Sequence, residues 1–293
     1  ATNGQPLAAP RSYVAAESYP FRVRGTQVRV VNEQGSPVVG ALLYKLSADA
    51  TTRADSFPLR NGQPVRTNAM GFIESRGQLS PGDQLVALQP ISATHAFTLY
   101  YSSATPTATG LNPYVVQAAG VQTLTVRADN PLTLFNLNLS LEWDARNDDT
   151  FLTDLARAIE NASDVLFDVS EGQVALGDVT VYQAKEGWSD ANVVIYASNS
   201  IHPRATMGGI VITPTNESGI NGIIPAAYWP GQIRMGPQWD PFGQNEAELR
   251  QDWWLAFAHE LSHYLLFLPD NYLGVENGLL RNIDCQGSFM TNT

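Results

Sequence analysis

The feature that most constrains the fold is a change of pattern near residue 130. From Phe21 to about Asn130 the chain consists of short runs rich in β-branched and aromatic residues, separated by clusters of Gly, Pro and Asn. Examples of these runs are ALLYKL, DQLVAL, AFTLYY and VQTLTVRA. Such spacing is typical of strands in a small β-sandwich. We therefore predict an irregular N-terminal arm over residues 1–20 and a β-sandwich accessory domain over residues 21–130.

After residue 130, helical and strand patterns alternate. The strand candidate LTLFNLNLSLEW is followed by apolar residues at helical spacing between Asp148 and Gly172. Four more strand candidates follow, namely QVALGDVTVYQ, ANVVIYAS, GGIVITP and GQIRMG. A last helix is predicted from Asn245 until Pro269 ends it. The order β-α-β-β-β-β-α predicts an α+β domain over residues 131–293, in a multidomain chain.

The composition indicates where the protein is found and which partners it is expected to bind. Only 15% of residues are charged, which is more typical of exported proteins, so we expect a secreted or cell-surface protein. The formal net charge is −11 and no basic stripe occurs, which argues against a nucleic-acid partner. No apolar run reaches the roughly 18–20 residues of a membrane span. The single cysteine, Cys285, excludes a disulfide within the chain.

The two ends of the sequence suggest processing. The chain begins without Met, as it would after removal of a signal peptide. It stops soon after the last predicted helix, so we expect the domain over residues 131–293 to be truncated at its C-terminus. The remainder of a longer precursor is accordingly one candidate partner.

The last helix carries the motif H-E-x-x-H at residues 259–263. His259 and His263 are four residues apart, about one helical turn, so both imidazoles leave the same side of the helix. They can meet one Zn²⁺ at about 2.0–2.1 Å. Glu260 lies beside the site and is placed to take a proton from a metal-bound water. The surrounding segment WWLAFAHELSHYLLFL is almost entirely apolar, and a metal would offset the cost of burying these polar groups.

The third metal ligand has several candidates. Asp270 follows the helix directly, where Pro269 breaks the helix and turns the next side chain back toward the histidines; a carboxylate is an ordinary zinc ligand. Asp270 is the better candidate, and its alternative role is that of a turn-forming residue after Pro. Glu276 is the rival, by analogy with zinc peptidases whose third ligand is a downstream Glu. The two remaining histidines, His95 and His202, lie far upstream.

These residues resemble known zinc peptidases. H-E-x-x-H followed by Asp270, with Tyr272 two residues later, is similar to snapalysin-type peptidases, although Asp270 is one position further on and a Gly is missing. The longer spacing, from His263 to Asp270, is similar to that in the metallopeptidase domain of the calcium-activated chloride channel regulators. The order β-α-β-β-β-β-α is similar to that of the metzincin N-terminal subdomain, and the segment DCQGSFM resembles the metzincin Met-turn. This resemblance implies a zincin-like, metzincin-type metallopeptidase domain over residues 131–293, with a mixed five-stranded sheet and an active-site helix, in which Met290 forms the floor of the site. It also implies that a substrate peptide pairs with an edge strand, here the segment beginning Gly208, Gly209 and Ile210.

The N-terminal region has its own resemblance. VRVVNEQGSPVVGALLYKL and TNAMGFIESRGQLSPGDQLVAL resemble carboxypeptidase-regulatory-like β-sandwich modules. The resemblance implies an accessory or spacer role without catalysis.

Tyr272 and an acidic run offer two further candidate sites. Tyr272 could donate a hydrogen bond to the oxyanion of a hydrolytic reaction. The acidic run after residue 143 could hold Ca²⁺, although its spacing matches no EF-hand loop and helix capping explains it.

We predict a secreted zinc endopeptidase that acts on a protein or peptide substrate. The alternative is a non-catalytic surface or adhesion protein that retains a structural metal, but such a site would not need Glu260.

Overall fold

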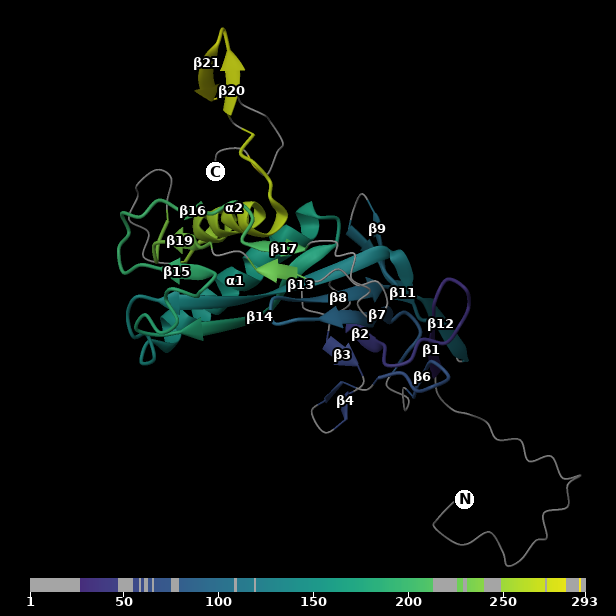
Figure 1. Cartoon of the computed structure of the whole chain (residues 1–293). Helices are drawn as coiled ribbons and strands as arrows, with labels where there is room; N and C mark the ends of the chain where they lie inside the picture. The colour runs from purple at the N-terminus through teal and green to yellow at the C-terminus, as the bar shows by residue number, and fades with distance from the viewer. Residues whose placement is uncertain are drawn as a thin grey trace, which may run out of the picture.

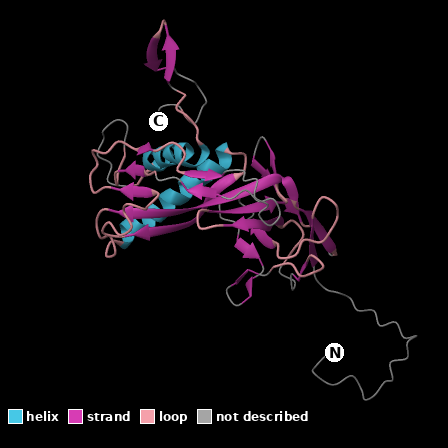
Figure 2. Ribbon diagram, viewed as in Figure 1, coloured by secondary structure: helices cyan, strands magenta, loops and turns pink. Residues whose placement is uncertain are grey.

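The computed structural model describes residues 27–46, 55–57, 59–60, 63–64, 66–74, 79–107, 110–118, 120–212, 226–228, 231–239, 249–271, 273–282 and 290. Over these residues the chain is mostly β-sheet with two α-helices (Figure 2). The largest sheet contains both parallel and antiparallel pairs. The predicted β-rich fold with mixed sheets and two helices is therefore confirmed.

Ten strands form the largest sheet, which we call the main sheet (Figure 1). They are β2 (Leu42–Leu46), β3 (Asp55–Phe57), β7 (Gln84–Ala93), β8 (Phe97–Ser102), β11 (Tyr114–Val115), β13 (Arg127–Leu141), β14 (Val174–Tyr182), β15 (Val193–Ile195), β16 (Arg204–Ala205) and β19 (Ile233–Met235). Their order is β16-β19-β15-β13-β8-β7-β2-β3, while β11 pairs with β7 and β14 pairs with β13.

Strand β13 connects the two halves of the main sheet, and the predicted domain boundary at residue 130 lies inside it. Along one side, β13 pairs first with β8 in antiparallel orientation and then with β15 in parallel orientation. Along the other side it pairs with β14 in parallel orientation. The backbone N–H groups of Asn136 and Glu142 accordingly donate toward β8 and β15, and that of Thr133 donates toward β14. One continuous sheet thus crosses the predicted boundary.

The smaller sheets lie around this one. A three-stranded sheet has the order β12-β1-β6 and comprises β1 (Gln27–Val31), β6 (Phe72–Glu74) and β12 (Val121–Thr125). Four two-stranded pairs are β4 (Leu59–Arg60) with β5 (Gln63–Pro64), β9 (Thr105–Thr107) with β10 (Gly110–Asn112), β17 (Ile210–Ile212) with β18 (Ala226–Tyr228), and β20 (Leu273–Glu276) with β21 (Leu279–Asn282). The β20–β21 hairpin projects away from the body of the molecule (Figure 1).

Two main hydrophobic cores correspond to the two sequence patterns. In the N-terminal region, Val28 and Val30 of β1 pack with Leu43 of β2 and Leu85 of β7, so the three-stranded sheet covers part of the main sheet. The larger core lies between one face of β13 and β15 and the two helices. Fully burying a Val or Leu side chain stabilises the folded state by about 1.5–3 kcal/mol, so each core contributes substantially to folding.

Helix α1 (Asp149–Val169) forms where the sequence predicts it. Asp148 caps its N-terminus, because its carboxylate accepts a hydrogen bond of 2.9 Å from the backbone N–H of Phe151. The buried residues recur every three or four positions and form one stripe against the sheet, namely Leu155, Ala158, Ile159, Ala162 and Leu166. The helix ends before Gly172, whose φ of 80° suits a residue without a Cβ.

Helix α2 (Gln251–Leu266) is buried almost all round. It begins at Gln251 rather than at the predicted Asn245, which lies outside the described residues; Leu249 and Arg250 precede the helix as irregular chain. The structure thus corrects the predicted start. Trp253 is fully buried and its indole N–H donates to the carbonyl oxygen of Gly236 at 2.9 Å, which anchors the first turn. Neither helix is long and apolar enough to cross a membrane, nor is any other within the described ranges.

Candidate metal centre

The second helix presents its two histidines side by side. The rings of His259 and His263 lie with their centroids 4.7 Å apart and nearly perpendicular, at 89°. Each residue is 8% exposed. The spacing of one helical turn therefore places both imidazoles at one partly accessible spot, as the sequence predicts.

The chain reverses direction immediately after α2. Phe267 adopts the left-handed conformation with φ 59° and ψ 24°, and its N–H donates to the carbonyl oxygen of Ser262. The N–H of Leu268 donates to the same carbonyl at 3.3 Å. A left-handed residue with a Cβ costs about 1–2 kcal/mol, so the reversal is held by its surroundings. It ends the helix two residues before Pro269, consistent with the bias of residues before Pro against helical geometry.

This reversal brings Asp270 to the histidines. The Oδ1 atom of Asp270 lies 3.2 Å from Nε2 of His259 and 3.2 Å from Nε2 of His263. One ligand atom from each residue lies within 4.8 Å of the others, and the three residues form a group that could hold a metal ion. Ligand atoms at about 2.1 Å from a tetrahedral ion lie roughly 3.4 Å from one another, so the separations fit. The predicted convergence of His259, His263 and Asp270 is confirmed.

A backbone carbonyl fixes the orientation of the second histidine. The Nδ1 atom of His263 lies 2.5 Å from the carbonyl oxygen of Leu268. A carbonyl can only accept, so Nδ1 carries a proton, and Nε2 is the ring nitrogen that faces Asp270. Metal-binding histidines are commonly oriented by such a bond from their other nitrogen. The same loop therefore supplies the carboxylate and sets the tautomer of His263.

Glu260 lies in the same buried environment. It is 7% exposed, and burial raises the pKa of its carboxyl group to about 7, with a further contribution from the charge of Asp270. The backbone N–H of Ala205 donates to the Glu260 carboxylate and acts in the opposite direction, lowering the pKa. This bond links Glu260 to β16, the edge strand of the main sheet.

Two glycines position the last turn of α2 in a way that the sequence did not reveal. The N–H groups of Gly208 and Gly209 donate to the carbonyl oxygens of His263 and Tyr264 at 2.9 and 2.7 Å. A Cβ on Gly208 would lie 2.1 Å from the ring of Phe267, and one on Gly209 would lie 1.7 Å from the ring of Tyr264. Only glycine permits this approach, and the adjacent Gly-Gly pair was the available signal.

These contacts change the interpretation of the predicted substrate strand. The predicted segment contains β17, which pairs only with β18 within the described residues and is not part of the main sheet. The glycine N–H groups at 208 and 209 already bind helix carbonyls, and Ile210 is buried in the core. The edge of the main sheet beside the site is β16 instead.

Tyr264 has a packing role. Its ring is fully buried, and its hydroxyl donates to the carbonyl oxygen of Gly231 at 3.3 Å. The same hydroxyl accepts a hydrogen bond of 3.0 Å from the side-chain amide of Asn192. Tyr264 therefore ties the helix to the loops that precede β15 and β19.

Met290 lies close to the metal-binding loop. It is 5% exposed, and its backbone carbonyl accepts a hydrogen bond of 3.3 Å from the N–H of Asn271, next to Asp270. Tyr272 and Cys285 lie outside the described residues. The backbone of Glu276 belongs to the projecting β20–β21 hairpin, while its side chain lies outside the described part.

The remaining histidines lie elsewhere in the fold. The ring of His202 packs edge-on against Trp239 with centroids 5.1 Å apart. His95 lines a separate polar cavity of about 300 Å³ beside Asp178 and Asp190. Within the described residues neither histidine belongs to a group with the geometry of a metal site.

The acidic run before α1 has structural roles. Asp148 caps the helix, and Asp144 binds the guanidinium of Arg146 at 2.5 Å. The Arg146 hydrogen bonds lower the pKa of Asp144 to about 2. No calcium-like cluster is found in this stretch of the described chain.

Comparison with known proteins yields no relative for this chain. No protein-family model matches it. No curated protein and no solved structure matches it either. The fold and the side-chain group therefore define the molecule only as a β-rich protein with a candidate His-His-Asp metal centre.

Proposed function

We propose that this protein is a secreted or cell-surface zinc-dependent endopeptidase in which His259, His263 and Asp270 hold the ion and Glu260 is the general base. One observation carries the proposal, namely that the buried carboxyl group of Glu260 lies beside three converging metal ligands. A carboxylate placed in this way can act as a general base toward a metal-bound water.

The donor set favours zinc. Two imidazoles and one carboxylate, with room for a further ligand, form the usual composition of a catalytic zinc site. A bound Zn²⁺ supplies Lewis-acid chemistry, polarising a carbonyl oxygen and lowering the pKa of water. The chain contributes the rest. Glu260 accepts and returns a proton, Leu268 holds the tautomer of His263 through its carbonyl, and the apolar surroundings limit access of bulk water.

The arrangement of the C-terminal region supports the resemblance to metzincins. Apart from the separate β17–β18 pair, the elements follow the order β13-α1-β14-β15-β16-β19-α2. This is the expected β-α-β-β-β-β-α order with β16 in place of the predicted strand GGIVITP, which forms β17 outside the main sheet. Five strands of the main sheet lie in the order β14-β13-β15-β19-β16, and only β16 is antiparallel to its neighbour among them. An extended peptide would pair with the edge strand β16, which reaches Glu260 through Ala205.

Metal content and casein hydrolysis, measured together, test the proposal. The wild-type protein should bind about one zinc per chain and hydrolyse casein, whereas Glu260→Gln should keep the metal and lose activity by about 10²–10⁴-fold. Asp270→Asn should weaken zinc binding, and the matched Glu276→Gln should not. Absence of metal from the wild-type protein would contradict the whole proposal.

The assay also addresses the alternative function. A surface or adhesion protein with a structural metal would contain zinc but show no activity in either the wild-type or the Glu260→Gln protein. The buried Glu260 favours the peptidase, because a structural site gains nothing from a carboxyl group that is costly to ionise.

A further inference from the structure

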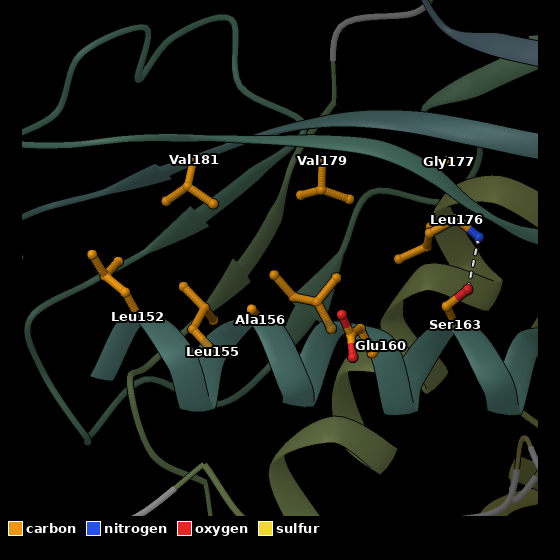
Figure 3. Close-up of a pocket in the computed structure, with 10 residues that line it drawn as sticks. Leu152, Leu155, Ala156, Glu160, Ser163, Leu176, Gly177, Val179 and Val181 are labelled. Carbon is orange, nitrogen blue, oxygen red and sulfur yellow. Dashed lines mark hydrogen bonds between the residues drawn. The ribbon is translucent and has the colours of Figure 1, made fainter. Parts of the chain in front are cut away.

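A groove between α1 and β14 lies on elements that contribute nothing to the metal centre. It is a cavity of about 250 Å³ that is open to one side. Its lining is mainly aliphatic and includes Leu152, Ala156, Leu176, Val179 and Val181 (Figure 3). In Figure 3 the side chains of the helix and the strand point toward one another across this space. We call it the α1–β14 groove.

The edge of β14 is covered at one end of the groove and open at the other. The N–H of Val174 donates to the hydroxyl of Ser170, and the N–H of Leu176 donates to the hydroxyl of Ser163, both at 2.9 Å. These serines of α1 or its C-cap thus satisfy the first two outward-pointing N–H groups. The Ser163 bond is drawn in Figure 3.

Beyond this point the outward-facing backbone groups belong to Val179 and Val181. The register shifts at Gly177 and Asp178, after which Val179 pairs with Leu137 and Val181 with Leu139 of β13. In this register the intervening residues bond to β13, so Val179 and Val181 direct their N–H and C=O groups away from the sheet. In the described part of the chain, no strand other than β13 pairs with β14. An open edge above an apolar groove is suited to strand addition.

The charge of the surface around the groove indicates which kind of segment it can bind. Helix α1 carries five acidic residues and one basic residue, Arg157. The guanidinium of Arg157 is paired with Asp154 at 3.2 Å, and Glu160 lines the groove itself. A second copy of this chain, with a formal charge of −11, would be repelled, whereas a basic segment would be attracted.

We propose that the α1–β14 groove binds an extended cationic segment of a partner protein, which adds to β14 at Val179 and Val181. Alternate apolar side chains of this segment enter the groove above Ala156, and its basic side chains face Glu160 and the acidic surface of α1. The site is a docking surface for a partner protein, and it does not depend on the metal.

Binding of short peptides tests this surface. A fluorescent hexapeptide of alternating Lys and Val is titrated into the whole chain with a chelator present, so that hydrolysis does not interfere. Ala156→Trp, which fills the groove from an exposed helix position, should weaken binding by at least about 10-fold. The control Thr153→Trp, at another exposed position of α1, should change it by less than about 2-fold. Ala156→Lys serves as a second variant if the Trp variant does not fold, and should weaken binding by repulsion.

Amide hydrogen exchange gives a direct readout of strand addition. The amides of Val179 and Val181 should exchange more slowly when the Lys-Val peptide is bound, and those of Val174 and Leu176 should not change. No binding of the peptide, equal binding of a Glu-Val hexapeptide, or unchanged exchange at Val179 and Val181 would overturn the proposal. Self-association that Ala156→Trp abolishes would instead assign the groove to a second copy.

Discussion

The two helices differ in how much of their surface is buried and in which residues they bury. Helix α1 buries one apolar stripe and leaves an acidic face outside, whereas α2 has eleven buried residues among its sixteen. The buried residues of α2 include His259, Glu260 and His263. Polar groups in such a position are costly unless they have partners, so their burial supports the proposed metal centre. Burial of a polar residue is therefore the more informative signal of function in this chain.

The largest expected effect is the difference in activity between losing a buried carboxylate, Glu260, and losing an exposed one, Asp154. Glu260→Gln should reduce casein hydrolysis by about 10²–10⁴-fold, because the proposed general base is lost from the site. Asp154→Asn on the exposed side of α1 should leave the rate unchanged. Initial rates at saturating zinc measure both variants. Equal losses would mean that the proposed distinction between the helices is wrong.

A core truncation should distinguish the helices in stability. Trp253→Ala in α2 should lower the free energy of unfolding by about 3–5 kcal/mol, since it removes a fully buried ring and its bond to Gly236. Val165→Ala in α1 should cost about 1 kcal/mol, because this side chain is only partly buried. Chemical denaturation followed by tryptophan fluorescence and circular dichroism would measure both. A small cost at Trp253 would contradict the inferred central position of α2.

The pKa of Glu260 predicts a dependence of stability on pH in the metal-free protein. Its pKa rises from 4.5 to about 7 on folding, so the folded state binds more protons between these values. Stability relative to Glu260→Gln should therefore be fully present below pH 4.5 and fall as the pH rises through about 7. The loss should be about 3 kcal/mol at most. Unfolding of both proteins in chelator at pH 4.5 and pH 8 measures it; parallel curves would exclude the shift.

The smallest effect concerns the start of α1. Asp148→Ala removes the cap on Phe151 N–H and should destabilise the protein by about 1 kcal/mol. Asp149→Ala removes only a charge from the first turn and should cost about 0.3 kcal/mol. Thermal melts of the two variants provide the comparison, and an equal loss would show that charge alone, rather than the hydrogen bond, stabilises this end.

Local patterns predicted one helix better than the other. The capping residue Asp148, the apolar stripe and Gly172 gave the position of α1, because each signal acts within a few residues. The start of α2 was misplaced, since a buried helix takes its limits from neighbours such as the carbonyl of Gly236. The continuity of β13 across the predicted boundary was missed for a related reason. Strand pairing with β8 and β15 joins segments distant in sequence.

By itself, the sequence determined the elements of the candidate site. The four-residue spacing of His259 and His263 fixes their common side of a helix, and Pro269 with Asp270 predicts a nearby carboxylate. Only the tertiary structure decided how these parts meet. The left-handed turn at Phe267, the carbonyl of Leu268 on His263 and the glycine N–H groups at 208 and 209 orient the ligands. Helical periodicity is a property of neighbouring residues, whereas convergence and burial depend on contacts between distant segments, which no local pattern encodes.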